Sequence, residues 1–410
     1  MKKNILFILF IIIILIAAVS YYKFFKVEKT NEPVKITVWT LQMNDYADYF
    51  NKIIAKYQAK NPNVTVEWID IPFSEGEKRT LAAVLTDNPP DLVNLNPDFS
   101  AILAQKGVLK EIPEDRLEGF NKEILDTSKF GEKLYIVPWY ATSAVTIYNK
   151  KLLSDAEILL PEKYDELPDV AKTVKEKTGK YITLIPLTEN DTTIKILNKY
   201  GLNDSKNIKS QQAVNLFKKF RNMYQEELLP PETITQTHRE ALEKYMSGEI
   251  VMLQAGANFL NMIRDNAPDV FKNTEVTYQM KGSLGQNDFS LMNFVIPLKS
   301  KNPDVALDFC LFLTNDENQI ELAKMTNILG TRDIVLEHEF YNDEKDLISK
   351  ARSISAKQLF NLKPVLRQSQ NQKEINNLVN AAVQRILLNK GKAEDILNQA
   401  SKTWQRIITR

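Results

Sequence analysis

The chain has 410 residues, more than a single hydrophobic core usually serves, so two or three domains are expected. Its 53 basic and 52 acidic residues leave a net charge of +1, which gives no electrostatic reason to expect a nucleic-acid partner. One cysteine, Cys310, excludes an intramolecular disulfide and a CxxC metal site, and two histidines leave little material for histidine-based catalysis. We therefore expect no metal, no cofactor and no nucleic acid.

The N-terminus carries an apolar run, Ile5–Val19, which is long for the core of a signal peptide and marginal for a membrane span. Ala18-Val19-Ser20 is typical of a cleavage site, whereas the aromatic and basic residues at 21–26 favour an interfacial anchor. We expect residues 1–33 to form an uncleaved anchor with a tether, with a cleaved signal segment as the alternative. No cysteine follows the run, so the protein is not expected to be a lipoprotein. The rest of the chain is expected to be extracytoplasmic and at the cell surface.

Strands and helices alternate in the first hundred residues after this segment. Strands are predicted at Lys35–Trp39, Val64–Ile71 and Asp91–Leu95. A helix is expected after each of them, at 46–57, at 80–85 and from the Asn96 cap to residue 107. This order, with its short connections, predicts a parallel, doubly wound sheet. Ligands in such sheets lie beyond the carboxyl ends of the strands, here at residues 40–44, 72–75 and 96–98.

The stretch from Lys133 to Lys150 interrupts this alternation. Two short β-like runs, Leu134–Val137 and Ala144–Tyr148, flank the aromatic pair Trp139-Tyr140. A strand that ends at Pro138 and resumes after the aromatic pair suits a chain that crosses between two lobes, with both rings facing a cleft. The stretch taken alone is equally explained by an internal hairpin with a buried Trp.

A second set of strands and helices follows this stretch. Its apolar patterns predict strands at Tyr181–Pro186, Glu249–Leu253, Val276–Met280 and Leu291–Ile296. The remainder is predicted to be mainly helical, with helices at 164–178, 192–200, 211–226, 238–247, 305–313, 317–326, 375–388 and 393–408. Cys310 lies in one of these apolar helices, so a buried structural thiol is expected.

Five stretches carry a resemblance to a known family. They are ITVWT with its helix, NPPDLVNLNPDFSAILAQKGVLKEI, KLYIVPWYATSAVTIYNKKLL, YMSGEIVMLQAGANFL and NPDVALDFCLFLTNDENQIELAKMTNILGTR. In this order the chain resembles the extracellular solute-binding proteins of ABC importers (family 1), close in plan to the maltose-binding proteins. The resemblance covers most of residues 35–332.

The resemblance implies an α/β, two-lobed, periplasmic-binding-protein-like fold of type II. Each lobe is expected to be a mostly parallel sheet flanked by helices, with a multi-strand hinge between the lobes and a helical C-terminal part. Lobe 1 would comprise residues 34–141 and 291–334, and lobe 2 would comprise 142–290 and 335–410. Crossings are expected near 140–144, 288–291 and 332–336.

The resemblance also implies a set of ligand-facing residues at the interface of the lobes. These are Trp39, Gln42, Asn96, Asp98, Trp139, Tyr140, Gln254, Gly256, Asn258, Asn293 and Arg332. Several have a second explanation: Trp39 as a core aromatic at a strand end, Asp98 as a complement to a helix dipole, and Arg332 as an ion-pair partner at the hinge.

The chain departs from the family pattern at two stacking positions. The family commonly has a Trp just after the glycine of the second-lobe loop, where this chain has Asn258 followed by Phe259. An aromatic residue is also often found in the C-terminal helical region, but residues 368–373 contain none. Fewer stacking platforms are therefore expected for a sugar ring.

The implied function is the capture of a small polar solute, above all a sugar or oligosaccharide, by a monomer that delivers it to the subunits of an ABC permease. A membrane-tethered sensor with the same fold is the first alternative. The second is a secreted carbohydrate-active hydrolase, which would need two carboxylates about 5 to 10 Å apart. Glu75 and Asp98 are candidates, but nothing in their spacing selects them, so we predict that the chain is not an enzyme.

Overall fold

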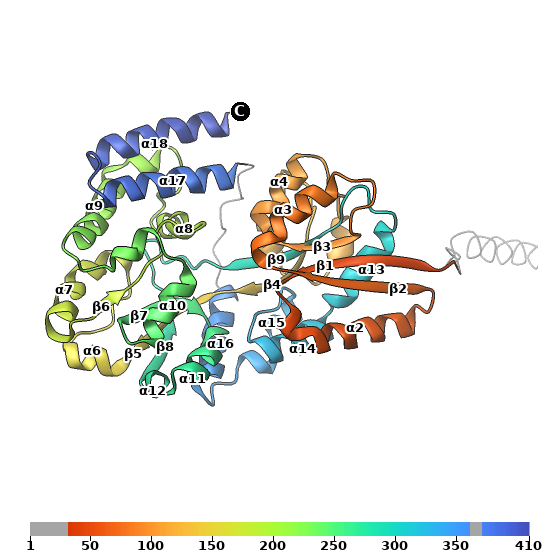
Figure 1. Ribbon diagram of the computed structural model, residues 1–410, viewed down its shortest axis with the longest axis horizontal. Coiled ribbons are helices and arrows are strands. Elements are labelled where there is room, and N and C mark those ends of the chain that lie inside the picture. The colour runs from red at the N-terminus through yellow and green to blue at the C-terminus, as the bar shows by residue number, and fades with distance from the viewer. Residues whose placement is uncertain (1–31, 361–370, 410) are drawn as a thin grey trace, which may run out of the picture.

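The computed structural model of the protein describes residues 32–360 and 371–409. Two lobes, each built on one sheet with helices around it, lie side by side (Figure 1). This confirms the predicted two-lobed α/β fold. In the described ranges no helix is both long and apolar enough to cross a membrane. Almost all of the predicted anchor, residues 1–33, lies outside these ranges.

The sheet of the first lobe has the strand order β2-β1-β3-β9-β4. Its strands are β1 Val34–Leu41, β2 Val64–Ile71, β3 Leu92–Leu95, β4 Val137–Thr142 and β9 Ser290–Val295. The helices of this part of the chain are α2 Ala47–Lys60, α3 Phe73–Val84, α4 Pro97–Gln105, α5 Lys122–Ser128, α13 Pro303–Leu313, α14 Asp316–Thr326 and α15 Asp333–Leu336. As predicted, α2, α3 and α4 follow the first three strands, although α3 begins well before the expected residue 80.

The first-lobe sheet is covered on both faces, as its sequence pattern requires. Side chains alternate along β1, so Ile36 and Val38 pack with Phe50 and Ile53 of α2, whereas Leu41 packs in a separate cluster on the other face. All four residues of β3 are buried, which explains why this strand is a short apolar run rather than an alternating one.

The sheet of the second lobe has the order β6-β7-β5-β8. Its strands are β5 Ala144–Asn149, β6 Tyr181–Thr183, β7 Ile250–Gly256 and β8 Thr274–Tyr278. The helices between them are α6 Lys150–Ala156, α7 Leu167–Thr178, α8 Thr192–Asn198, α9 Gln211–Gln225, α10 His238–Met246, α11 Phe259–Asn266 and α12 Pro268–Phe271. Short 3-10 helices lie at Asn44–Tyr46, Glu114–Leu117, Tyr164–Glu166, Asn207–Lys209, Pro231–Ile234 and Glu339–Tyr341.

Both sheets are mixed, so the expectation of mostly parallel sheets is wrong. Parallel pairing links β1 to β2, β1 to β3 and β6 to β7. The strands that carry the chain between the lobes, β4, β5, β8 and β9, pair in the antiparallel sense. The physical reason is that these strands enter each sheet from the hinge rather than through a helical crossover.

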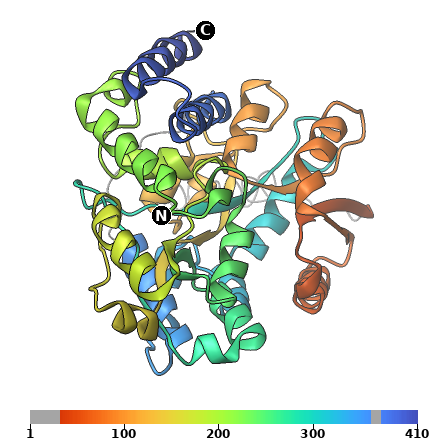
Figure 2. The ribbon, with the colours of Figure 1, turned by 60° about the vertical axis from the view of Figure 1, so that its left-hand side comes forward.

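The C-terminal helices are α16 Leu347–Phe360, α17 Gln372–Leu387 and α18 Ala393–Ile408. The last two pack against α9 in the second lobe (Figure 2). Val335, Leu336 and Tyr341 pack in a first-lobe core, as do Ala356 and Leu359 of α16, and α16 also contacts β5 and β8 of the second lobe. The position of the third crossing and the exact lobe boundaries stay a prediction.

Candidate ligand site between the lobes

The chain passes from the first sheet to the second at Ser143, because β4 ends at Thr142 and β5 begins at Ala144. A second connection runs from Tyr278, the end of β8, to Ser290, the start of β9. Ser290 pairs with Thr142 in the first sheet, so both connections leave from the same place. The predicted first and second crossings lie at these positions.

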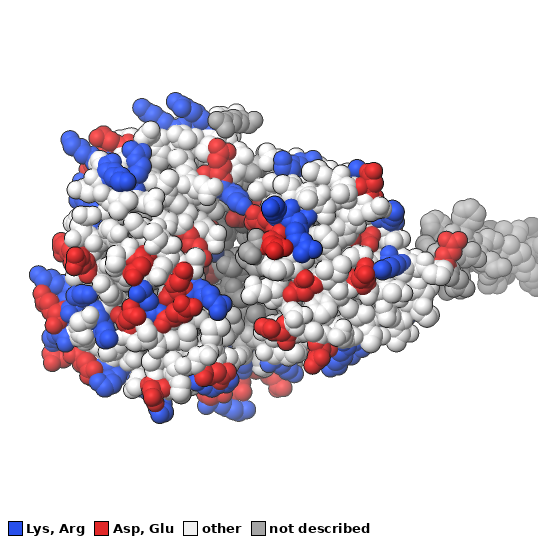
Figure 3. Space-filling model, viewed as in Figure 1, with Lys and Arg blue, Asp and Glu red and all other residues white. Residues whose placement is uncertain are grey.

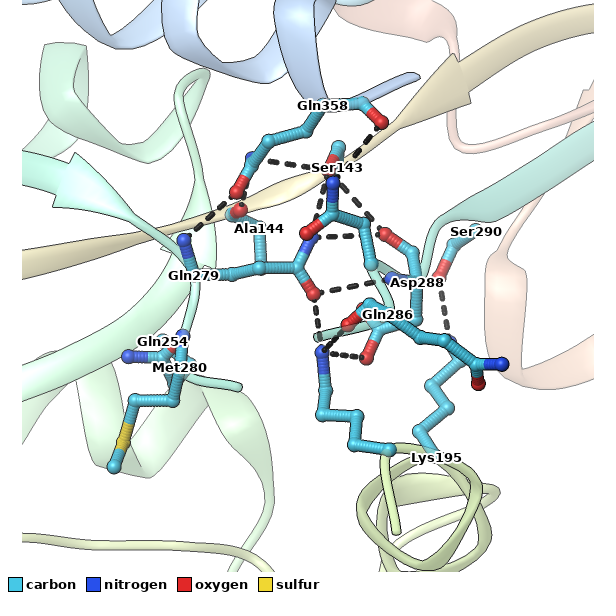
Figure 4. Close-up of polar contacts among 12 residues, drawn as sticks. Ser143, Ala144, Lys195, Gln254, Gln279, Met280, Gln286, Asp288, Ser290 and Gln358 are labelled. Carbon is cyan, nitrogen blue, oxygen red and sulfur yellow. Dashed lines mark hydrogen bonds and ion pairs between the residues drawn. The ribbon is translucent and has the colours of Figure 1, made fainter. Parts of the chain in front are cut away.

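A polar network ties the connections together (Figure 4). The Ser143 hydroxyl accepts hydrogen bonds from Nε2 of Gln279 (3.1 Å) and of Gln358 (3.2 Å), and it donates to the carbonyl of Asp288 (3.3 Å). Gln358 of α16 also donates to the carbonyl of Ala144 at 2.8 Å. Helix α16 therefore holds both interlobe connections at the hinge.

Lys199, immediately after α8, is a buried charge in this hinge, with only 2% of its side chain exposed. Its Nζ lies 2.9 Å from the Asp288 carboxylate and donates to Oε1 of Gln279. Burial opposes ionisation of Asp288, but Lys199 and Lys195 outweigh burial and hold the pKa of this carboxyl below its ordinary value. The pair is therefore charged and hydrogen-bonded, as a buried pair must be.

The carboxyl ends of the parallel strands in both lobes border this hinge. Leu95, which ends β3, pairs with Asn293 of β9, and Gly256, which ends β7, pairs with Ala144 at the crossing. The surface is hollowed between the lobes on the face seen in Figure 3, where charged side chains of both signs meet. Ligands bind at such strand ends in open α/β sheets, so this is the candidate site.

The first lobe presents four of the predicted residues at its strand ends. Gln42 is exposed directly after β1 and has a left-handed backbone with φ of 54°, while its N–H donates to the Ile71 carbonyl (2.9 Å). Trp39 is half-buried under the Arg79 guanidinium, 5.8 Å from its ring centroid. Asn96 caps α4 by accepting from the N–H of Phe99 (2.8 Å). Tyr140 is half-buried at the crossing, and burial raises the pKa of its hydroxyl, so it is a neutral hydrogen-bonding group.

Asp98 lies in the first turn of α4 and is half-buried. Burial, together with Asp191 of the second lobe, raises the pKa of this carboxyl from 3.8 to about 6; Glu77 acts in the same sense, and Lys195 and Lys373 act against it. Charges from both lobes therefore surround Asp98. A carboxylate in this position can accept hydrogen bonds from a hydroxyl-rich ligand.

This raised pKa predicts how stability depends on pH. Between about pH 4 and pH 6 the folded protein keeps a proton that the unfolded chain has lost, so Asp98 lowers stability as the pH rises through this window. We expect Asp98→Asn to raise the free energy of unfolding by about 1 to 2 kcal/mol at neutral pH and to have little effect below about pH 4. Urea unfolding at both pH values measures this. Asp48, exposed in the first turn of α2, is the control, and Asp48→Asn should not stabilise the protein at neutral pH. If Asp98→Asn raises the free energy of unfolding equally at both pH values, the prediction is contradicted.

The second lobe contributes the loop after β7 and the start of α11. Asn258 and Phe259 are half-buried there, and the Phe259 ring meets the His238 ring edge-on at 5.2 Å. The amide of Gln254 is engaged within its own lobe, since it donates to the hydroxyl of Thr146 (2.8 Å) and accepts from the N–H of Met280 (2.9 Å). Asn258 therefore remains a candidate for ligand contact, and Gln254 supports the sheet edge.

Trp139 and Asn293 do not face the cleft, and that expectation is wrong. The Trp139 side chain has 0% exposure and packs among Phe50, Phe294 and Tyr140, with ring centroids 4.7–5.9 Å away. Asn293 is also 0% exposed, and its amide donates to the Ser100 hydroxyl inside the first lobe (2.9 Å). Trp139 is turned inward because β4 continues through Pro138 with an irregular register between 138 and 140, instead of ending there.

Arg332 lies within the first lobe, where the structure favours the ion-pair explanation over a ligand clamp. Its Nε donates to the Asp316 carboxylate, and its guanidinium lies 4.9 Å from the centroid of the Phe120 ring. Both partners belong to the first lobe. We therefore leave Arg332 out of the proposed contact set.

Four charged residues at the cleft were not singled out from the sequence. Lys195 of α8 pairs with Asp191 (3.0 Å) and donates to the Ser290 hydroxyl at the hinge (2.9 Å), and Glu77 of α3 pairs with Lys373 of α17. One signal was present in the sequence: residues 191, 195 and 199 are spaced by four, which places them on one face of the predicted helix. Within the described ranges no group of three or more His, Cys, Asp or Glu has the arrangement of a metal site.

Comparison with known proteins links this geometry to one family. The family described as bacterial extracellular solute-binding protein matches residues 42–320. Among curated proteins, the diacetylchitobiose-binding protein DasA of Streptomyces coelicolor is 22% identical over 326 residues, which cover 73% of each chain. The arabinooligosaccharide-binding protein of Halalkalibacterium halodurans is 20% identical and covers 58% of this chain and 56% of its own.

Solved structures share the fold over nearly the whole chain. A protein from Synechococcus sp. MITs9220, described as a putative oligosaccharide periplasmic-binding protein in complex with zinc, has a TM-score of 0.83 at 28% identity and covers 91% of this chain and 99% of its own. The GacH receptor of Streptomyces glaucescens, solved unliganded and with acarbose, has a TM-score of 0.76 at 17% identity and covers 92% of this chain and 99% of its own.

The family match extends over more than half of the chain. Because the family and the similar proteins are solute-binding proteins, the prediction of a binding protein rather than an enzyme is confirmed. The chain belongs to the bacterial extracellular solute-binding proteins.

Proposed function

We propose that the protein captures a carbohydrate between its two lobes and delivers it to an ABC permease in the membrane. The observation that carries this proposal is the meeting of strand ends from both lobes at the hinge, with half-buried aromatic and polar side chains on each side. Relatives named for diacetylchitobiose and arabinooligosaccharides, and similar structures solved with acarbose and maltose, support a carbohydrate as the ligand class.

The side chains proposed to contact the ligand suit a molecule with many hydroxyl groups. In the first lobe they are Trp39, Gln42, Asn96, Asp98 and Tyr140, and in the second lobe they are Asn258 and Phe259. Carboxylate and amide groups form paired hydrogen bonds with neighbouring hydroxyls, and aromatic rings cover the apolar faces of a sugar. A micromolar affinity requires a net free energy of only about 8 kcal/mol, which a few such bonds and one or two aromatic faces supply.

We propose that ligand binding favours the closed arrangement of the lobes, because the two sets of contacts are made together only when the lobes meet. The permease would then receive the loaded, closed monomer. Membership of a family described as extracellular supports a working site outside the cytoplasm. We further propose that residues 1–33 tether the protein to the membrane. Fractionation of cells that express the full chain tests the tether, which predicts recovery with membranes rather than in the medium.

A ligand screen on the chain from Val34 onward tests the proposal. Ligands that bind only the folded state raise the melting temperature, and a concentration of one hundred times Kd stabilises by about 2.7 kcal/mol. We expect an oligosaccharide in a panel that includes chito-, arabino- and malto-oligosaccharides to raise the melting temperature. Amino acids and short peptides serve as controls. A rise with these controls and with no carbohydrate would reject the assigned ligand class.

The contact set has its own test. Trp39→Ala should weaken binding of the carbohydrate that scores in the screen by about tenfold or more, because an aromatic face is lost. Trp68 of β2 provides the control, since its ring stacks on Phe50 (4.6 Å) and its Nε1 donates to the Thr40 hydroxyl (2.7 Å) within the first lobe. Trp68→Phe should leave the affinity unchanged in isothermal titration. Equal losses in both variants would contradict the proposed contact set.

A further inference from the structure

An ion pair links a helix of the first lobe to a helix of the second. Glu77 lies in α3, whose residues Leu81 and Val84 pack in a first-lobe core. Lys373 lies at the start of α17, whose buried face packs in the second-lobe core. The Lys373 Nζ and Glu77 Oε2 atoms are 2.5 Å apart, although the residues are 296 positions apart in the chain. Figure 1 shows α17 directed toward α3 and α4.

Both partners are held on elements that are fixed within their own lobes. The second carboxylate oxygen of Glu77 accepts from Nδ2 of Asn96 (3.4 Å), the residue that caps α4. On the other side, Asn380 of α17 donates to the carbonyls of Thr188 (3.1 Å) and Asn190 (2.9 Å), just before α8. The distance between Glu77 and Lys373 therefore reports the separation of the two lobes rather than the motion of a loose segment.

The ion pair lies outside the hinge strands and within a field of charges from both lobes. The pKa of Asp98 is shifted by Glu77 of its own lobe and by Asp191, Lys195 and Lys373 of the other lobe. Lys195 is already engaged by Asp191 and by Ser290 at the hinge. Among the described residues at this part of the cleft, Lys373 is the second-lobe cation that pairs with a first-lobe carboxylate.

We propose that Glu77 and Lys373 form a latch that raises the population of the closed arrangement of the lobes in the ligand-free protein, a population that ligand binding then raises further. The latch is a positioning device for ligand capture, and it acts whatever solute the cleft takes. The side chains of Lys373 and Glu77 are 50% and 39% exposed, so salt weakens their attraction. An exposed ion pair of this kind shifts a two-state equilibrium by about two- to fivefold, enough to change the populations of open and closed forms.

The test measures lobe separation in ligand-free protein. Lys106→Cys and Lys209→Cys, at exposed positions of the first and second lobes, carry spin labels for electron-resonance distance measurements, and Cys310 is buried and does not interfere. We expect Glu77→Gln and Lys373→Gln each to shift the distance distribution toward longer values by about two- to fivefold in population. About 1 M salt should shift the unmodified protein in the same direction.

Charge exchange and a matched pair distinguish the latch from a general effect of substitution. The double variant Glu77→Lys with Lys373→Glu should restore the original distribution. Lys218 and Glu394 form a pair with the same 2.5 Å separation and similar exposure (38% and 42%) between two helices of the second lobe, so Glu394→Gln should change nothing. Unchanged distributions in both glutamine variants would overturn the proposal. So would failure of the exchanged pair to restore closure, or an equal shift in Glu394→Gln.

Discussion

Replacing Trp139 with Ala is expected to destabilise the protein by about 3 to 5 kcal/mol, because it removes the largest fully buried side chain among the described residues and leaves a cavity. The cavity would be lined by the rings of Phe50, Tyr140 and Phe294, which belong to three different elements and cannot all move inward. Urea or thermal unfolding of the ligand-free protein measures the loss.

Trp139→Phe separates the contribution of ring volume to stability from that of the polar Nε1 atom. The Trp139 Nε1 atom has no hydrogen-bond partner among the described residues, so Phe gives up no hydrogen bond and should lose less than half as much stability as Ala. A loss of ligand affinity at unchanged stability in Trp139→Ala would contradict the core position and would indicate that this ring faces the cleft.

Replacing Lys199 with Met is expected to destabilise the hinge by about 2 to 4 kcal/mol. The substitution conserves the shape of the side chain but leaves the Asp288 carboxylate without its 2.9 Å partner, and a carboxylate that is largely shielded from water is costly without a counter-charge. The network around Gln279 and Ser143 would lose an anchoring charge at the same time. Unfolding by urea measures the effect.

A double substitution shows whether charge imbalance is the cause. Lys199→Met combined with Asp288→Asn removes both charges, and we expect it to recover at least half of the stability lost in Lys199→Met. Lys195→Met is the comparison for a less buried lysine on the same helix face, and its effect should be smaller. If the double variant is as unstable as the sum of the two single variants, the charge pair is not what stabilises this hinge.

Local sequence signals predicted most of the elements of the fold because they depend on neighbours in the chain. The apolar stripe at Tyr49, Phe50, Ile53 and Tyr57 predicts α2, and Asn96-Pro97 marks the start of α4. The direction of the hinge strands was not predicted. Strand direction in a sheet depends on which distant segments pair, and no local pattern in β5 or β9 encodes it.

The stretch around Trp139 shows how a strong local signal can mislead. Proline usually ends a strand, yet β4 accepts Pro138 beside an irregularity in the pairing with β9. Because side chains alternate along a strand, a shift of one residue exchanges the faces of the sheet. The aromatic pair was predicted to face the cleft together, but only Tyr140 keeps part of its surface exposed.

Residues at the ends of strands were predictable, whereas contacts between the lobes were not. Gln42, Asn96 and Asp98 follow strands directly, so the position of the sheet edge suffices to select them. The pairs Glu77–Lys373 and Lys199–Asp288 join segments 296 and 89 positions apart, and they form only once these distant segments have come together. Charged residues are common on any surface, so sequence alone gives no reason to choose these four.

The central claim, that a carbohydrate is held between two lobes that close around it, is tested most directly by small-angle X-ray scattering with and without the carbohydrate that gives the largest thermal shift. The account predicts a smaller radius of gyration in the presence of that ligand, at saturating concentration, and no change with a carbohydrate that gives no thermal shift. An unchanged radius of gyration for a ligand that demonstrably binds would contradict capture by lobe closure.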